Sequence, residues 1–334
     1  MDAPPLIATP TPAYKDRRAG LIFFGVMGIL FGCFFLLSAP AAVIGQIAAA
    51  KKAQSELSTA LVLTSLFTPA MLAAGLIWLG IGSIKARRWA RAILLCLGWM
   101  GLCMGAASFP IVIMTLGSLE DMLRQQGQDV APVVLTITKV VMVATTTVLY
   151  VVIPAAVVLF YRSPHVKHTC EKLDPVERWT DRCPLPVIAI CLLQAYGAFS
   201  MLAMMAQFGA AFPLAGFVVT GWPSWMLWLG FVGFSLYAAW GFYHLRYRAW
   251  LIYTAGVMLL GISSVVTFLR IDLLDYYRMS GFSEWQINQI AASPLVRGHM
   301  MAWLSLVGII VLGGYLAFLR RYFVAPSPSP DAAG

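Results

Sequence analysis

Residues 20–44 read GLIFFGVMGILFGCFFLLSAPAAVI, a stretch that contains no charged side chain. About 20 consecutive apolar residues in a helix are enough to cross the hydrocarbon core of a bilayer. Lipid offers no hydrogen-bond partner to a peptide group, so a segment that crosses it alone has to be a helix. This stretch therefore predicts a transmembrane helix.

Seven further apolar runs of similar length follow it, near residues 60–82, 92–117, 134–161, 185–209, 223–243, 250–269 and 299–319. Hydrophobic residues make up 60% of the chain and charged residues 11%, against about 25% charged in a soluble domain. This composition excludes a water-soluble protein, and it excludes a nucleic-acid-binding one despite the net charge of +9. The predicted fold class is all-α, a polytopic integral membrane protein with eight transmembrane helices.

Two connections carry expectations of their own. The apolar turn within 205–230 is compatible with a re-entrant hairpin. The connection 270–298 predicts a short amphipathic helix, which Ser283 and Gln286 begin as a capping box. Within the spans, Gly28 with Gly32 and Gly101 with Gly105 form Gly-x3-Gly steps that predict close helix contacts.

The positions of the basic residues predict the orientation of the helices. One set of connections, which includes both chain ends, carries 16 of the 23 Lys and Arg residues, and the other set carries 6. The remaining one, Lys139, lies inside a run. Basic loops stay in the cytoplasm, so both termini are expected there. The excess of Ala, Gly and Arg favours a bacterial source, and we expect the bacterial inner (plasma) membrane.

The chain also shows signs of an internal duplication. Residues 80–93 (GIGSIKARRWARAI) and 239–252 (AWGFYHLRYRAWLI) share Gly, Arg, Ala and Ile at a constant offset, and Arg162 and Arg321 keep the same offset. Units with an even number of spans repeat in the same orientation, which predicts two parallel four-helix repeats. The alternative is that short inner loops are all rich in Arg. The predicted organisation is a disordered cytoplasmic tail (1–19), a first unit (20–161), an ordered cytoplasmic linker (162–184), a second unit (185–321) and a disordered tail (322–334).

The linker holds the only cluster of chemically versatile side chains. His165, His168, Cys170 and Cys183 supply imidazole and thiolate, the usual ligands of zinc, although their spacing matches no standard zinc motif. The alternative interpretation is a folded loop held by ion pairs and by four apolar anchors, Val166, Leu173, Val176 and Trp179. The absence of Gly from this segment argues against a flexible tether.

The sequence HVKHTCEKLDPVERWTDRCPLPV (165–187) resembles linkers in uncharacterised bacterial multi-pass membrane proteins built from four-span units. The resemblance covers this segment and the general layout of the chain. It implies the fold described above and no activity.

A few polar side chains lie within the predicted spans. Thr145, Gln194, Tyr196 and Ser263 are candidates to line a ligand site between the two halves, although such residues more often form hydrogen bonds between helices. The spans contain no Asp or Glu, and the chain has no phosphate-binding loop, zinc-protease motif or nucleophile elbow. We therefore predict no catalytic residues and no cofactor.

These observations favour a non-enzymatic inner-membrane protein that acts as a structural, sensory or complex subunit. The alternative is a facilitative transporter, or a protein that binds a small ligand, with its site between the two halves. The expected partners are the lipid bilayer and either a second copy of the chain or another membrane protein, with no nucleic acid.

Overall fold

A computed structural model of the chain describes residues 14–53, 59–125, 131–208, 211–282, 284–291, 296 and 299–324. Within this part, eight helices are long and apolar enough to cross a membrane. They are α1 (Arg18–Ala53), α2 (Thr59–Ile84), α3 (Arg88–Gln125), the run α4–η1–α5 (Pro132–Thr147, Val148–Val152, Ile153–Arg162), α7 (Leu185–Phe208), α8 (Trp222–Tyr243), α9 (Tyr247–Arg270) and α12 (Met300–Phe323). Every run predicted from the sequence corresponds to one of these helices.

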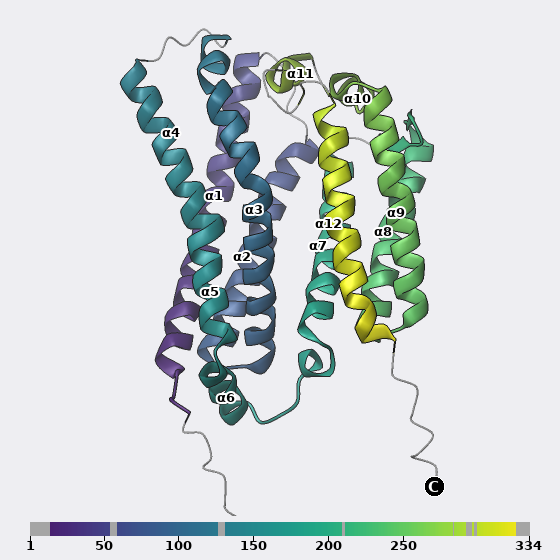
Figure 1. Ribbon diagram of the computed structural model, residues 1–334. Coiled ribbons are helices and arrows are strands. Elements are labelled where there is room, and N and C mark those ends of the chain that lie inside the picture. The colour runs from purple at the N-terminus through teal and green to yellow at the C-terminus, as the bar shows by residue number, and fades with distance from the viewer. Residues whose placement is uncertain are drawn as a thin grey trace, which may run out of the picture.

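The eight helices form two bundles side by side, which Figure 1 shows with both described chain ends at the same end of the molecule. The first bundle contains α1 to α5, in which α1 packs along α2 and α3 packs along α5. The second contains α7, α8, α9 and α12, with α7 packed along α8 and α9 along α12. The bundles meet where α7 contacts α2 and α3. We call the end at which the described chain begins (Tyr14) and ends (Val324) the basic end.

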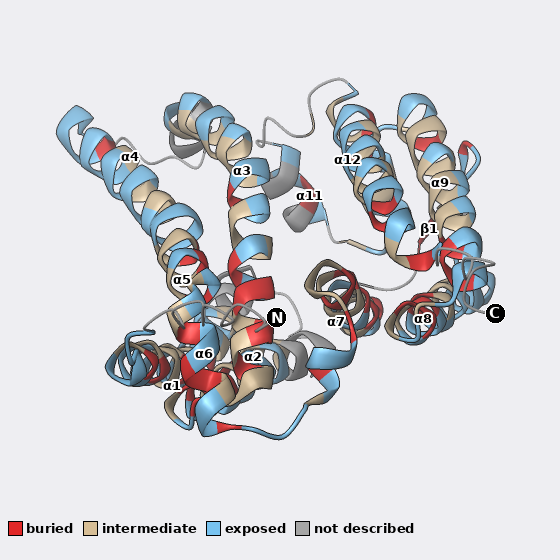
Figure 2. Ribbon diagram, turned by 60° about the horizontal axis from the view of Figure 1, so that its bottom comes forward, coloured by how far each residue is buried: buried red, intermediate tan, exposed pale blue. Residues whose placement is uncertain are grey.

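Apolar side chains cover the outer faces of both bundles, and Figure 2 shows these exposed positions along nearly every helix. Leu37 is 76% exposed, Leu159 is 74% exposed and Val311 is 66% exposed. Water would penalise this surface at about 25 cal/mol per Å², whereas hydrocarbon does not. The surface therefore belongs to a protein surrounded by lipid.

Glycines set the spacing between helices in the first bundle. A Cβ atom on Gly25 would lie 2.7 Å from the carbonyl oxygen of Gly80, and one on Gly80 would lie 2.6 Å from that of Gly25. Gly28 and Gly32 continue the same contact between α1 and α2, and a Cβ on Gly105 would lie 2.5 Å from the carbonyl oxygen of Tyr150. The close contacts predicted from the Gly-x3-Gly steps are thus present, with Tyr150 in the π-helical turn η1.

The two short turns at the basic end have the same geometry. After α2, the Arg87 N–H donates to the Gly82 carbonyl at 2.9 Å, and Ala86 has a φ of 50°. After α8, the Arg246 N–H donates to the Gly241 carbonyl at 2.9 Å, and Leu245 has a φ of 52°. This pattern is a Schellman helix end, here with a left-handed residue other than glycine.

Glycine is required in the last helical turn before each connection, because the next helix crosses directly over this residue. A Cβ on Gly82 would lie 2.7 Å from the Ala90 Cβ, and one on Gly241 would lie 2.2 Å from the Ala249 Cβ. The shared Gly and Ala residues of the two loops therefore serve the same packing contact.

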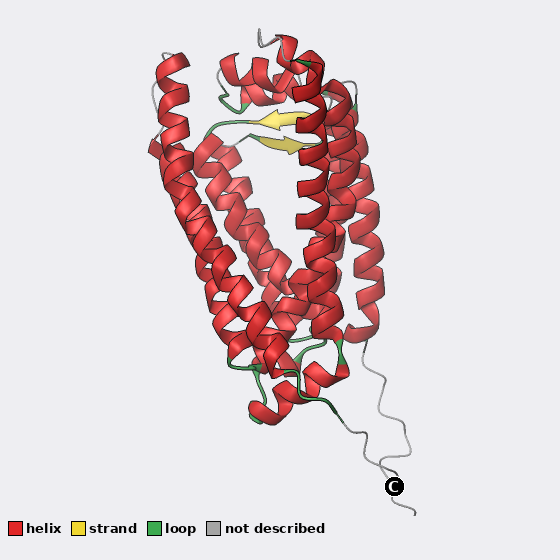
Figure 3. Cartoon of the chain, turned by 90° about the vertical axis from the view of Figure 1, so that its left-hand side faces the viewer, coloured by secondary structure: helices red, strands yellow, loops and turns green. Residues whose placement is uncertain are grey.

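The opposite end is closed by small elements (Figure 3). The region 205–230, for which the sequence is compatible with a re-entrant hairpin, contains a β-hairpin of β1 (Phe212–Leu214) and β2 (Phe217–Val219). Its two central residues, Ala215 and Gly216, both have positive φ, as a tight hairpin turn requires. The connection predicted to hold one short helix holds two, α10 (Leu273–Met279) and α11 (Glu284–Ala291). Ser283 of the predicted capping box lies outside the described residues, as does the side chain of Gln286.

Replacing Gly80 by Leu should destabilise the protein by about 2 kcal/mol, because the added side chain meets backbone that cannot move aside. Gly75 on the same helix is the matched control, since a Cβ there has no neighbour within 4 Å. Gly75→Leu should change stability by less than about 0.5 kcal/mol. Thermal unfolding of both variants in detergent measures the difference, and equal unfolding temperatures would contradict this account of the α1–α2 contact.

Candidate functional site

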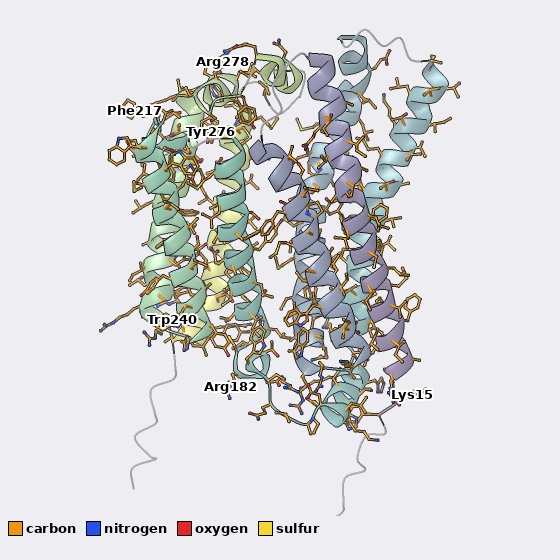
Figure 4. All side chains as sticks on the ribbon, turned by 180° about the vertical axis from the view of Figure 1, so that it is seen from behind. Lys15, Arg182, Phe217, Trp240, Tyr276 and Arg278 are labelled. Atoms are coloured by element: carbon orange, nitrogen blue, oxygen red, sulfur yellow. The ribbon has the colours of Figure 1, made fainter. Side chains whose placement is uncertain are left out.

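The linker, residues 162–184, lies at the basic end and crosses from the first bundle to the second. It contains α6 (Pro164–Leu173) and the 3-10 turn η2 (Trp179–Arg182). On the inner face of α6, Val166 and Cys170 are buried and pack with Leu21 of α1. Arg182, which is labelled in Figure 4, lies at this end of the molecule, where the chain passes between the bundles. The linker is thus a folded part of the structure.

The central polar group of the linker is the carboxylate of Asp174, which is only 2% exposed. It accepts hydrogen bonds from Arg178 Nη2 at 2.6 Å and Arg178 Nε at 3.0 Å. It also accepts from Arg87 Nη1 at 3.1 Å and from the Arg88 backbone N–H at 3.3 Å. The donors of Arg87 and Arg88 attach the linker to the turn between α2 and α3.

The same donors keep Asp174 ionised. The hydrogen bonds from Arg178 lower its pKa below the ordinary 3.8, the Arg88 N–H and Arg87 lower it further, and burial opposes them. A carboxylate removed from water is tolerated when several donors satisfy its oxygens. Only one of the four apolar anchors predicted for the linker is buried. Val166 is buried, whereas Leu173, Val176 and Trp179 are between 43% and 60% exposed.

The chain preceding α1 also packs on α6. The Arg17 N–H donates to Thr169 Oγ1 at 3.2 Å, and the Lys15 N–H donates to His165 Nδ1 at 3.3 Å. The Tyr14 ring stacks on His168 with 4.4 Å between ring centroids. Of the predicted tail 1–19, the described part therefore contacts the linker and begins α1, and residues 1–13 lie outside the described residues.

The linker contacts the second bundle through η2 and the residues that follow it. The Tyr243 hydroxyl at the end of α8 donates to the Trp179 carbonyl at 3.1 Å. Cys183 is buried in the core of the second bundle together with Cys96 of α3, whose Sγ lies 3.5 Å from the Leu185 carbonyl. One short segment therefore joins both bundles at the basic end.

A cavity of about 250 Å³ lies where α3, α6, η2 and the start of α7 meet. We call it the junction pocket. It is lined by Arg88, Arg91, Ala92, Lys167, Cys170, Glu171, Thr180, Asp181, Cys183 and Leu185. Both acids in this set have a basic partner, since Asp181 lies 3.7 Å from Arg88 Nη1 and Glu171 lies 3.8 Å from Lys167 Nζ.

The four predicted zinc ligands do not come together as a set. Cys170 and Cys183 both line the junction pocket, whereas His165 and His168 contact Tyr14. Burial raises the pKa of each thiol to about 11, which disfavours the thiolate that binds metal. In the described part of the chain, no three His, Cys, Asp or Glu residues are grouped so that they could hold a metal ion.

The four predicted ligand-lining residues are also spread over the structure. The Gln194 amide donates to the Tyr253 hydroxyl within the second bundle, and Ser263 Oγ accepts from the Ala215 N–H in the hairpin turn at 2.6 Å. Thr145 and Tyr196 are exposed on different bundles. None of the contacts described for these four residues joins two of them.

The ion pairs predicted to hold the linker are present, since Asp174 pairs with Arg178. The sequence did not indicate the junction pocket or the contact of Asp174 with the turn between α2 and α3. It gives Arg87, Arg88 and Arg91 a role in topology, and Arg87 a place in the repeat, but points to no role for Thr180. The one available signal was the composition of the linker, which holds 4 of the 14 acids and 2 of the 4 histidines of the chain within residues 162–184.

Comparison of the chain with models of known families, with curated proteins and with solved structures finds no match.

Replacing Asp174 by Asn should lower stability by about 2 kcal/mol above pH 5, because the donors of Arg178 and Arg87 lose their ionic partner. The loss should shrink as pH falls below 4, since Asp174 has a depressed pKa and its stabilisation is lost on protonation. The matched control is Glu177→Gln, which removes an exposed carboxylate from the same segment. Unfolding temperatures measured from pH 3 to pH 7 test this, and a loss that is independent of pH, or equal in both variants, would count against it.

Proposed function

We propose that this chain is a bacterial inner-membrane protein with both termini in the cytoplasm, and that it acts as a non-enzymatic structural, sensory or complex subunit. The observation that carries the proposal is the junction at the basic end, where buried Asp174 and the linker join two four-helix bundles. Hydrogen bonds and ion pairs make this junction, and such interactions are suited to holding helices in place. The apolar runs of the eight spans contain no acid that could take part in proton transfer within the membrane, since Glu120 and Asp121 of α3 lie beyond its apolar run.

Two parallel four-helix repeats are part of the proposal. The turns after α2 and after α8 have the same hydrogen bonds, the same left-handed residue and the same glycine-to-alanine contact, all at one offset in the sequence. Each turn joins the second and third span of its bundle, and neighbouring spans pair in the same order in both. These matches support duplication of a four-span unit. The resemblance of the linker to those of four-span proteins agrees with the same interpretation.

The alternative function, a facilitative transporter with its site between the halves, requires polar groups at the seam. Gln194, the most buried of the four predicted ligand-lining residues, bonds to Tyr253 inside one bundle. The polar pair is thereby satisfied without a ligand, which favours the structural interpretation.

Reporter fusions test the proposed orientation. A reporter attached after Arg88, at the basic end, should be active in the cytoplasm. One attached after Gln125, at the far end of α3, should be active on the other side. The basis is the 16 to 6 distribution of Lys and Arg. Activity of both reporters on one side would refute the topology.

Solvent access to Gln194 tests the transporter alternative. In a variant that lacks the six native cysteines, Gln194→Cys should resist a membrane-impermeant maleimide from both sides, because Gln194 is 9% exposed and faces Tyr253. Lys172→Cys on the exposed surface of the linker is the positive control. Rapid labelling at position 194 would show a water-filled path and would favour the transporter.

A further inference from the structure

The junction pocket contains more basic groups than its own acids balance. Arg88, Arg91 and Lys167 contribute three positive charges and Asp181 and Glu171 two negative ones. Asp181 pairs with Arg88 and Glu171 with Lys167. The side chain of Arg91 makes no ion pair in the described part of the chain and is the basic group that is left over.

Several donors in the pocket have no partner. Arg91 Nε and Arg88 Nε are buried without a hydrogen bond, and so is the Thr180 hydroxyl oxygen. Thr180 is only 3% exposed and lines the pocket. An unpaired polar group in such a place costs about 1–3 kcal/mol, a cost that a ligand with acceptor oxygens would remove.

The backbone of α3 adds to the positive electrostatic potential of the pocket. Arg88 is the first residue of α3, a helix of 38 residues, so the positive end of the helix dipole lies at the pocket. The Arg88 N–H is taken by Asp174. The ligand contacts would therefore come from the side chains of Arg88, Arg91 and Thr180.

From this arrangement we propose that the junction pocket binds the phosphate group of an organic phosphate ester, held by Arg91 and Arg88 with Thr180 as a hydroxyl donor. Two guanidinium groups with free donors suit phosphate oxygens better than they suit a neutral ligand. Bare anions need little space, whereas a cavity of about 250 Å³ with Ala92, Cys183 and Leu185 in its wall also accommodates a short carbon group.

Two sources share this chemistry. One is the headgroup of an anionic phospholipid, since basic pockets between helix ends receive such headgroups. The other is a soluble phosphate monoester from the aqueous side. The proposal does not rest on the orientation of the protein in its membrane, so the reporter fusions described above succeed or fail independently of it.

Arg91→Gln is the main test variant, because the Arg91 side chain has no partner whose loss would unfold the protein. Arg182→Gln is its matched control, which removes the same charge from the exposed surface of η2 beside the pocket. Thr180→Val is the second variant, since it keeps the shape and removes the unpaired hydroxyl. Without ligand, Thr180→Val should unfold at the same or a higher temperature than the parent protein.

The measurement is the unfolding temperature of the full chain in a neutral detergent during titration with dioleoyl phosphatidylglycerol, glycerol 3-phosphate or inorganic phosphate. Dioleoyl phosphatidylcholine serves as the lipid without net charge. A ligand that binds only the folded protein raises the unfolding temperature. We expect Arg91→Gln and Thr180→Val to need about tenfold more ligand for the same rise, and Arg182→Gln to behave like the parent.

The pattern of response identifies the source. Stabilisation by phosphatidylglycerol alone supports the lipid headgroup, and stabilisation by glycerol 3-phosphate supports the soluble ester. The proposal is overturned if no phosphate compound stabilises the protein, or if Arg182→Gln weakens the response as much as Arg91→Gln. It is also overturned if Zn²⁺ stabilises the protein and Cys170→Ser abolishes that effect, since the pocket would then be a metal site.

Discussion

Hydrocarbon gives a peptide group nothing to bond with, and this constraint determines where every other kind of interaction in the chain is found. Each span satisfies its backbone as a helix, which leaves side-chain polarity confined to helix ends and a few hydroxyl and amide contacts. Lipid is as apolar as leucine, so the bundles gain little from burying apolar surface. Close backbone contact replaces that gain, and Gly25 and Gly80 lie face to face in the first bundle for this reason.

The same constraint concentrates charge at the basic end. The short turns between spans carry the arginines from which the orientation is predicted. The acids of the linker form ion pairs and hydrogen bonds with these arginines. Asp174 uses Arg87, Arg178 and the Arg88 N–H, and Asp181 uses Arg88 again. The arginines from which the topology is predicted are therefore also residues that hold the junction together. Arg91 lies about one turn further into α3 and makes no ion pair with these acids in the described part of the chain.

The fold was predictable because the thickness of a bilayer sets the length of each span, and apolar run length is visible in the sequence. The pairing of the strands in the hairpin Phe212–Val219 was not, since its residues are as apolar as those of a span and no residue pattern marks its tight turn at Ala215 and Gly216. The sequence also did not show which side of each helix faces the interior of its bundle. Tyr196 and Thr145 turn outward and Gln194 turns inward, and an apolar environment on all sides leaves no periodicity to reveal this. The pair of Asp174 with Arg178 is local. Its contacts with Arg87 and Arg88, and the pocket beside them, could not be predicted because those partners lie about 90 positions away in the chain.

The position of the junction pocket has a thermodynamic consequence. Its wall combines α3 of the first bundle with η2 and Leu185 at the start of the second, so a ligand there contacts both bundles at once. A phosphate held by Arg91 and Thr180 stabilises only the arrangement in which η2 lies against α3. By linkage, any movement that separates the bundles at this end must weaken ligand binding to the same degree. At a ligand concentration a hundred times the Kd the stabilisation amounts to about 2.7 kcal/mol. The site is then almost always occupied, and the ligand keeps the two bundles joined. At concentrations near the Kd the same contacts would report ligand level as a change in how the two bundles are joined, which is what a sensory subunit requires.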